Sequence, residues 1–174
     1  MQAQYHGNRD PRLVRIQRGG TLDDKTHQSL ALWAAQCAER VLHLFEEQCP
    51  DDMRPAEAIK AARAWARGEI TMMQAREFAY AAHDAAREAE GAAHEAARAA
   101  GHAVATAHMA DHELGSAFYA LRAIMIAYPD KPEKVTEERE WQRQTLMPDI
   151  RELVLDDMQK RAKKFRGIFS ETAN

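Results

Sequence analysis

The residues best suited to metal or acid–base chemistry lie in one short segment, His108-Met109-Ala110-Asp111-His112-Glu113. Histidines four positions apart on a helix can share a metal ion, and a neighbouring carboxylate can supply an oxygen ligand or orient an imidazole. The segment lacks the glutamate that directly follows the first histidine of the zinc-protease motif. We therefore predict no metal site here. A small metal-dependent enzyme or metal sensor using His108, Asp111 and His112 is kept as the alternative.

A second group of polar residues recurs at helical spacing: His83, Arg87, Glu90, His94 and Arg98. Stripes of alternating charge at this spacing are typical of the exposed face of a helix. We interpret this stripe as a solvated face without a catalytic role.

The remaining candidates for catalysis lack the context that each chemistry needs. Neither a Walker phosphate loop nor a strand followed by GxGxxG occurs, and Ser29, Ser116 and Ser170 have no nucleophile elbow around them. Cys37 and Cys49 are separated by about 18 Å if they share one helix, which is too far for a disulfide. Cys37 falls on an apolar stripe and is expected in the core. The sequence therefore predicts no catalytic residue and no cofactor.

The charge distribution does not favour a nucleic-acid partner, because the formal net charge is -3. One basic patch lies near the C-terminus and consists of Lys160, Arg161, Lys163, Lys164 and Arg166. Cations near a helix C-terminus favour the helix dipole, so a solvated helix end is the preferred interpretation. A nucleic-acid accessory protein acting through this basic helix is a further alternative.

Helical periodicity covers most of the chain. Apolar residues between positions 24 and 48 recur at three- and four-residue steps and predict the first core helix. Pro55 suits the first turn of a second helix, which Gly68 ends. Thr71 and Gln74 have the spacing of a capping box and predict the start of a third.

Within the alanine-rich stretch 72–128, the apolar residues from Phe78 to Met125 keep helical phase almost throughout, yet one helix over these ~50 residues would be roughly 75 Å long. That exceeds the width of a compact domain of this chain length, so the stretch must fold back. Gly91, Gly101 and the region 111–115 are the candidate breaks, with Asp111 as an expected N-cap.

The two ends of the chain complete the expected architecture. Residues 1–20 read as an extended arm with, at most, one edge strand at Leu13–Ile16, and residues 170–174 as a frayed tail. Short helices are expected over Pro132–Leu146 and Pro148–Phe165. The predicted fold class is all-α, a single compact bundle of about six or seven antiparallel alanine-rich helices.

Length and composition place the whole chain, residues 1–174, in a single helical domain. The hydrophobic fraction of 45% and charged fraction of 29% are ordinary for a globular protein. No segment resembles a signal sequence or approaches the ~20 apolar residues of a membrane span. We therefore expect a cytoplasmic protein without a membrane partner, and a homo-oligomer is compatible with the sequence.

Six segments together carry a resemblance to a known family. They are Asp10-Pro11-Arg12-Leu13, Arg18-Gly19-Gly20-Thr21-Leu22, Ala31-Leu32-Trp33-Ala34-Ala35-Gln36-Cys37-Ala38-Glu39-Arg40, Ala64-Trp65-Ala66-Arg67-Gly68-Glu69-Ile70, Ala107-His108-Met109-Ala110-Asp111-His112-Glu113-Leu114-Gly115 and Ile150-Arg151-Glu152-Leu153-Val154-Leu155-Asp156-Asp157. The chain resembles, over about residues 10–157, a bacterial family of small helical immunity proteins associated with polymorphic toxin systems. Beyond Asp157 the sequence departs from the family pattern.

The resemblance implies a non-enzymatic protein that binds and neutralises a cognate toxin encoded nearby, and it carries over no catalytic residues. Some similar sequences bear the name of the DNA-repair exonuclease subunit SbcC. That name implies an ATPase with a Walker motif and long coiled coils, and this chain has neither.

The predicted toxin-facing surface is acidic and lies at the first turn between helices, around Glu46, Glu47, Asp51 and Asp52. Many toxins that act against competing bacteria cleave nucleic acid and present basic clefts. A carboxylate cluster on a turn between rigid helices could occupy such a cleft as phosphate does.

Overall fold

The computed structural model describes residues 5–170, and this range contains seven α-helices and no strand. Their bounds are α1 Asp24–Glu46, α2 Arg54–Ala66, α3 Met72–Glu88, α4 Gly91–Ala105, α5 Glu113–Ala127, α6 Pro132–Gln144 and α7 Pro148–Lys160. Three short 3-10 turns are η1 Pro11–Leu13, η2 Ile16–Arg18 and η3 Ala110–His112. The predicted all-α class is confirmed. Residues 1–4 of the expected arm and 171–174 of the expected tail lie outside the described range.

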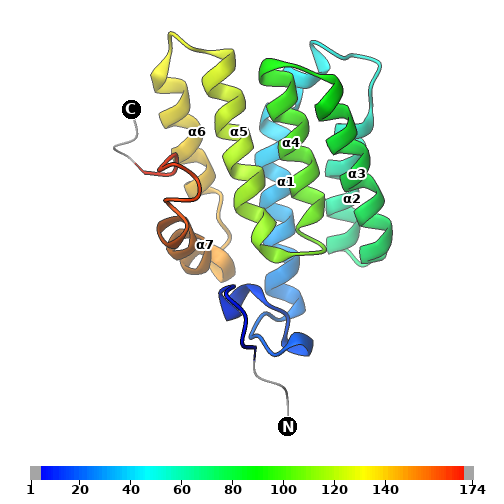
Figure 1. Cartoon of the computed structure of the whole chain (residues 1–174), viewed down its shortest axis with the longest axis vertical. Coiled ribbons are helices and arrows are strands. Elements are labelled where there is room, and N and C mark those ends of the chain that lie inside the picture. Colours follow the sequence, from blue (N-terminus) through cyan, green and yellow to red (C-terminus); the bar gives the residue numbers. More distant parts are fainter. Residues whose placement is uncertain (1–4, 171–174) are drawn as a thin grey trace.

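Helices α1 to α6 run alternately up and down beside one another, whereas α7 turns aside near the lower ends of α5 and α6 (Figure 1). Helix α4 is central because it packs against α1, α3 and α5. The turns α1–α2, α3–α4 and α5–α6 consequently lie at one end of the bundle, and the N-terminal segment lies at the other (Figure 1).

The core depends on alanine. Small side chains allow helix backbones to approach closely, and the fully or nearly buried alanines of α4 are Ala93, Ala96, Ala97, Ala99, Ala100 and Ala103. Large side chains fill the wider gaps, and Trp33 is the largest that is fully buried. Its indole Nε1 donates to the Gln142 carbonyl oxygen at 2.9 Å, which ties α1 to α6 and satisfies the one polar atom of the ring.

The helix boundaries confirm part of the prediction. Thr71 and Gln74 form the expected reciprocal capping box at the start of α3, and the chain breaks between α3 and α4 at Gly91, whose φ is 57°. Gly101 is not a break, since it lies inside α4. Asp111 does not cap α5 either: His112 occupies the N-cap position without a side-chain bond, and Asp111 belongs to η3.

The described part of the N-terminal arm folds into turns. Strand pairing is reduced to one isolated bridge between Arg15 and Leu22, so the edge strand expected at Leu13–Ile16 does not form. Leu13 and Val14 are instead buried against the bundle.

The last helix is shorter than predicted. Helix α7 ends at Lys160 rather than near Phe165, and turns follow in which Arg166 and Gly167 have φ values of 53° and 69°. The helical conformation is already lost at Arg161, whose φ of -99° and ψ of 12° depart from helical values. In the described range, no helix has the length and apolarity needed to cross a bilayer.

Candidate functional site

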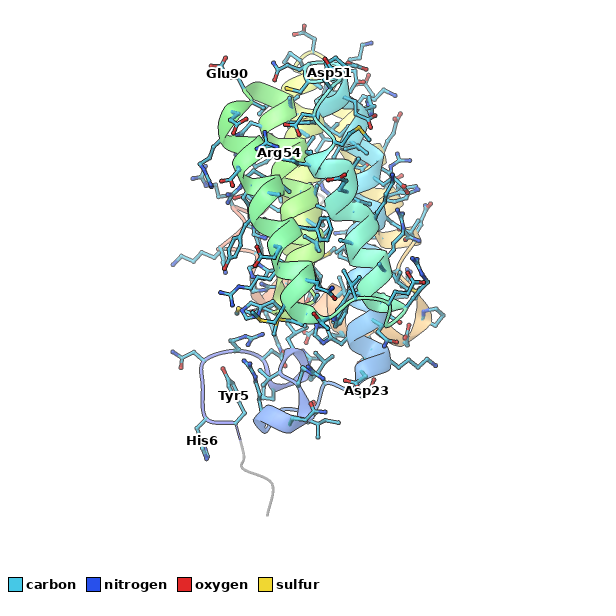
Figure 2. The ribbon with its side chains drawn as sticks, turned by 90° about the vertical axis from the view of Figure 1, so that its right-hand side faces the viewer. Tyr5, His6, Asp23, Asp51, Arg54 and Glu90 are labelled. Carbon is cyan, nitrogen blue, oxygen red and sulfur yellow. The ribbon has the colours of Figure 1, made fainter. Side chains whose placement is uncertain are left out.

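The predicted acidic turn lies where the structure makes it accessible. Figure 2 shows Asp51, in the α1–α2 turn, and Glu90, in the α3–α4 turn, at the same end of the bundle, with Arg54 just below them. Glu46, Glu47 and Asp51 are exposed, and so is Glu90. We call these four residues the acidic end.

Asp52 differs from the other predicted site residues because it has a structural partner. Both of its carboxylate oxygens accept hydrogen bonds from the Arg54 guanidinium, at 2.9 Å from Nε and 2.7 Å from Nη2. Arg54 also donates to Glu88 Oε2 at 2.6 Å. These bonds from Arg54 lower the pKa of Asp52. Asp52 is therefore not a freely solvated carboxylate, and its contact with Arg54 joins the α1–α2 turn to the end of α3.

A second contact joins the same two turns. The Gln48 side-chain oxygen Oε1 accepts a hydrogen bond from the Glu90 backbone N–H at 3.3 Å. A groove of about 550 Å³ opens beside this contact, and its lining includes Leu44, Glu47, Glu90 and Tyr128. Two residues of the acidic end, Glu47 and Glu90, therefore line a groove built from α1, α4 and the end of α5.

His83 and His112, which the sequence patterns placed in two separate groups, are joined through His102, because α3, α4 and η3 bring the three rings together. The ring centroids of His83 and His102 are 5.3 Å apart, and those of His102 and His112 are 5.1 Å apart. Tyr119 stacks on His102 at 5.0 Å. We call these four side chains the histidine cluster. His83 therefore does not belong to a fully solvated face.

Two glycines make room for these rings. A Cβ atom on Gly101 would lie 2.4 Å from Cε1 of His83, and one on Gly115 would lie 2.4 Å from Nδ1 of His102. Burial disfavours the charged imidazolium, so it lowers the pKa of His83 to about 4 and lowers the pKa values of His102 and His112 as well. The cluster is consequently neutral at physiological pH.

The three residues of the metal-binding alternative, His108, Asp111 and His112, do not converge on one point. Asp111 binds Arg9, with its Oδ1 and Oδ2 atoms 2.9 and 3.1 Å from Nη2 and Nε. His112 faces His102, whereas His108 lines a small pocket with the N-terminal segment. No three His, Cys, Asp or Glu side chains within residues 5–170 are arranged to hold a metal ion.

A buried charge network near the start of α5 was missed by sequence reasoning. Glu113 is fully buried, and its Oε1 atom accepts from Arg161 Nη2 at 3.1 Å. Arg161 also pairs with Asp157, which is 2% exposed. Burial raises the pKa of Glu113. Only the apolar neighbours of Glu113 in sequence could have signalled this burial.

The basic patch is partly neutralised by the same packing. Lys160 pairs with Asp10 and Asp156, so the patch does not act as five uncompensated cations. Lys163, Lys164 and Arg166 are exposed in the turns after α7. Two of the five cations, Lys160 and Arg161, are thus compensated by carboxylates, which weakens the case for a nucleic-acid partner.

The family-model comparison is decisive for classification. Residues 20–149 match the model described as Imm-5 like putative immunity protein. The chain belongs to this family. Searches of curated proteins and of solved structures gave no match.

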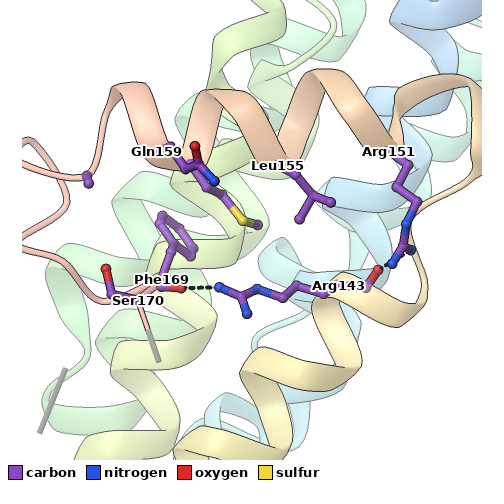
Figure 3. Close-up of a pocket in the computed structure, with 8 residues that line it drawn as sticks. Arg143, Arg151, Leu155, Gln159, Phe169 and Ser170 are labelled. Atoms are coloured by element: carbon purple, nitrogen blue, oxygen red, sulfur yellow. Dashed lines mark hydrogen bonds between the residues drawn. The ribbon is translucent and has the colours of Figure 1, made fainter. Parts of the chain in front are cut away.

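The segment matched by the Imm-5 like family contains α1 to α6, and therefore both the acidic end and the histidine cluster. All of α7 but its first two residues, and the turns after it, lie beyond the match. They form one wall of the pocket in Figure 3, of about 620 Å³, where Arg143 donates to the Phe169 carbonyl and Arg151 to the Arg143 carbonyl. The first bond holds the segment after α7 against α6, and the second holds α7 itself against α6.

Proposed function

We propose that this member of the Imm-5 like family is a non-enzymatic immunity protein. In this proposal it binds a cognate toxin in the bacterial cytoplasm and blocks the toxin's active site or a surface that the toxin needs. Family membership supports the immunity role in general. The acidic end is the proposed contact surface.

The observation that carries the choice of surface is the Arg54 contact. By binding Asp52 and Glu88 together, Arg54 holds the α1–α2 turn beside the α3–α4 turn. The carboxylates of Glu47, Asp51 and Glu90 are thereby presented from two turns whose relative position is fixed. A preorganised surface loses less conformational entropy on binding than a mobile loop does.

The proposed partner surface is basic, as in a cleft that binds nucleic acid. Complementary charge mainly accelerates association, because it steers the diffusing partners together. The acidic end is expected to occupy the cleft in place of the phosphates of a substrate.

The test uses the full chain and the toxin encoded beside it. Changing Glu47, Asp51 and Glu90 together to lysine should slow association at least ~10-fold at low ionic strength, and the difference should shrink as salt screens the charges. Asp52 stays unchanged because it binds Arg54. Stopped-flow or surface-based kinetics measure the rate, and protection of toxin-expressing cells gives the biological readout.

A matched control carries the same change in net charge elsewhere. Glu77, Glu140 and Glu152 are exposed on α3, α6 and α7, and their triple lysine variant should associate at nearly the wild-type rate. If the acidic-end variant also associates at the wild-type rate and still protects cells, the contact surface lies elsewhere. If the wild-type protein does not bind the neighbouring toxin, the proposed function itself is wrong.

A further inference from the structure

An apolar pocket of about 400 Å³ shares the lining residue Tyr128 with the groove at the acidic end. It is built from α5, α6 and the segment that follows α7. Its lining residues are Phe118, Arg122, Met125, Tyr128, Pro129, Pro132, Val135, Thr136, Arg139, Phe165, Arg166 and Ile168. This volume lies within the range of sites that bind small molecules.

The wall formed by the C-terminal segment is fixed in place. Arg139, which is buried on α6, donates from Nε to the Ile168 carbonyl oxygen at 2.9 Å. The rings of Phe118 and Phe165 are 5.2 Å apart and join the same segment to α5. The pocket is therefore a preformed feature of the described fold rather than a gap between loosely packed segments.

The charged side chains that line the pocket are all positive. Three arginines line it and no carboxylate does. Arg122 is engaged by Glu95, with Nη2 2.8 Å from Oε1. Arg166 is exposed, and its guanidinium makes no ion pair within residues 5–170. An apolar lining with an accessible guanidinium at its edge favours a ligand that is itself apolar and carries an anion.

Apolar side chains are also exposed at the rim. Met125, which lines the pocket from α5, is 48% exposed. Exposed apolar surface next to a pocket is typical of binding sites, and methionine adapts to ligands of varied shape.

We propose that this pocket binds a small amphipathic carboxylate. The aliphatic or aromatic body of the ligand lies against Phe118, Met125 and Val135, and its carboxylate pairs with Arg166. A planar guanidinium recognises a carboxylate through two parallel hydrogen bonds, which accounts for the chemical class of the anion. This site does not depend on toxin binding.

The experiment uses decanoate as the probe and the full chain as the receptor. Isothermal titration calorimetry should detect saturable binding with one molecule of decanoate per chain. Decyltrimethylammonium, which has the same chain and the opposite charge, should bind at least about tenfold more weakly, and acetate, which lacks the chain, should not bind measurably. Methyl resonances from labelled methionine should show a shift for Met125.

Two variants test the location. Arg166→Gly removes the guanidinium at a backbone position with φ of 53°, which glycine adopts without strain, so the fold should be preserved. It should weaken decanoate binding about tenfold, as expected for a lost charged hydrogen bond. Thr136→Trp places a large ring in the pocket from an exposed position on α6 and should abolish binding.

Lys163→Ala is the matched control, because Lys163 is an exposed cation in the same turns that does not line the pocket. It should bind decanoate as the wild type does. Circular dichroism confirms that each variant is folded. The proposal is overturned if decanoate fails to saturate, if both head groups bind equally, or if folded Thr136→Trp binds with unchanged affinity.

Discussion

The imidazole rings of His102 and His112 face each other with their Nδ1 atoms 3.1 Å apart. At this distance one Nδ1 carries a proton and donates it, while the other accepts. If both rings were protonated, two donors and two positive charges would face each other in a buried site. The hydrogen bond therefore forms between neutral imidazoles, and protonation of both rings at low pH should destabilise the folded state.

The contribution of the histidine cluster to the free energy of unfolding should fall as the pH falls below about 6.5. In the unfolded chain histidines bind protons near pH 6.5, whereas in the folded protein burial lowers the pKa of His83 to about 4. The unfolded state then binds more protons between these values, so stability is fully present above pH 6.5 and is lost on acidification. For His83 alone the loss between pH 7 and pH 5 is about 2 kcal/mol.

Urea denaturation at a series of pH values measures this dependence. The variant His83→Asn should have a flatter curve between pH 7 and pH 5 than the wild type. His43→Asn, at an exposed position of α1, should keep the wild-type slope. Parallel curves for all three proteins would show that the histidine cluster does not control acid stability.

Gly115→Ala should destabilise the protein by about 1–3 kcal/mol, although alanine is normally the better helix former. The added Cβ would lie 2.4 Å from Nδ1 and 2.8 Å from Cγ of His102, and Cγ lies too close to the backbone to swing away. Gly101→Ala should cost less, since its Cβ meets the outer edge of the His83 ring.

A double-mutant cycle isolates the cause. In a His102→Ala background the ring is gone, so Gly115→Ala should become neutral or stabilising. An unchanged penalty in that background would mean that the glycine is needed for another reason. Chemical denaturation of the four proteins of the cycle provides the free energies.

Local signals in the sequence predicted most of the fold. The capping box at Thr71 and the prolines at the starts of α2, α6 and α7 act within one turn of a helix, so their effect is readable without tertiary information. Gly101 was misread because a glycine in a helix indicates either a break or a close approach. Only the position of His83, on a different helix, distinguishes the two.

The exposure of the proposed contact surface was predictable from local signals, but its internal contacts were not. Exposure of Glu47 and Asp51 follows from their place in a turn. The pairing of Asp52 and Glu88 through Arg54 does not, because it depends on how α3 returns to the first turn. Burial of Glu113 was equally hidden, since its partner Arg161 lies 48 residues away.

Purified protein should contain no stoichiometric transition metal at His108 and His112. A zinc site usually needs three or more protein ligands, and the carboxylate of Asp111 is bound by Arg9. Elemental analysis of the wild type and of the variant with both histidines changed to alanine makes the test. One metal per wild-type chain, lost in the variant, would favour the enzyme or sensor alternative.

Arg161→Met should be the most damaging of these substitutions, with a loss of about 3–5 kcal/mol in the free energy of unfolding. It would leave the carboxylates of Glu113 and Asp157 buried without their cation. Desolvation is the main cause of the raised pKa of Glu113 and the Arg161 charge opposes it, so the variant should raise this pKa further. A carboxylate whose pKa is raised on folding binds protons more readily in the folded state, and stability is therefore recovered as the pH falls.

The neighbouring residue supplies the control for this last prediction. Lys160→Met also removes a cation, but the Lys160 pairs with Asp10 and Asp156 are solvent-exposed, so the loss should stay below about 1 kcal/mol. The further change Glu113→Gln in the Arg161→Met protein removes one buried charge and should restore part of the stability at pH 7. Urea denaturation at pH 7 and pH 5 measures all of these variants. Equal losses for the Lys160 and Arg161 variants, without recovery at pH 5, would show that Arg161 is not needed to compensate the buried carboxylates.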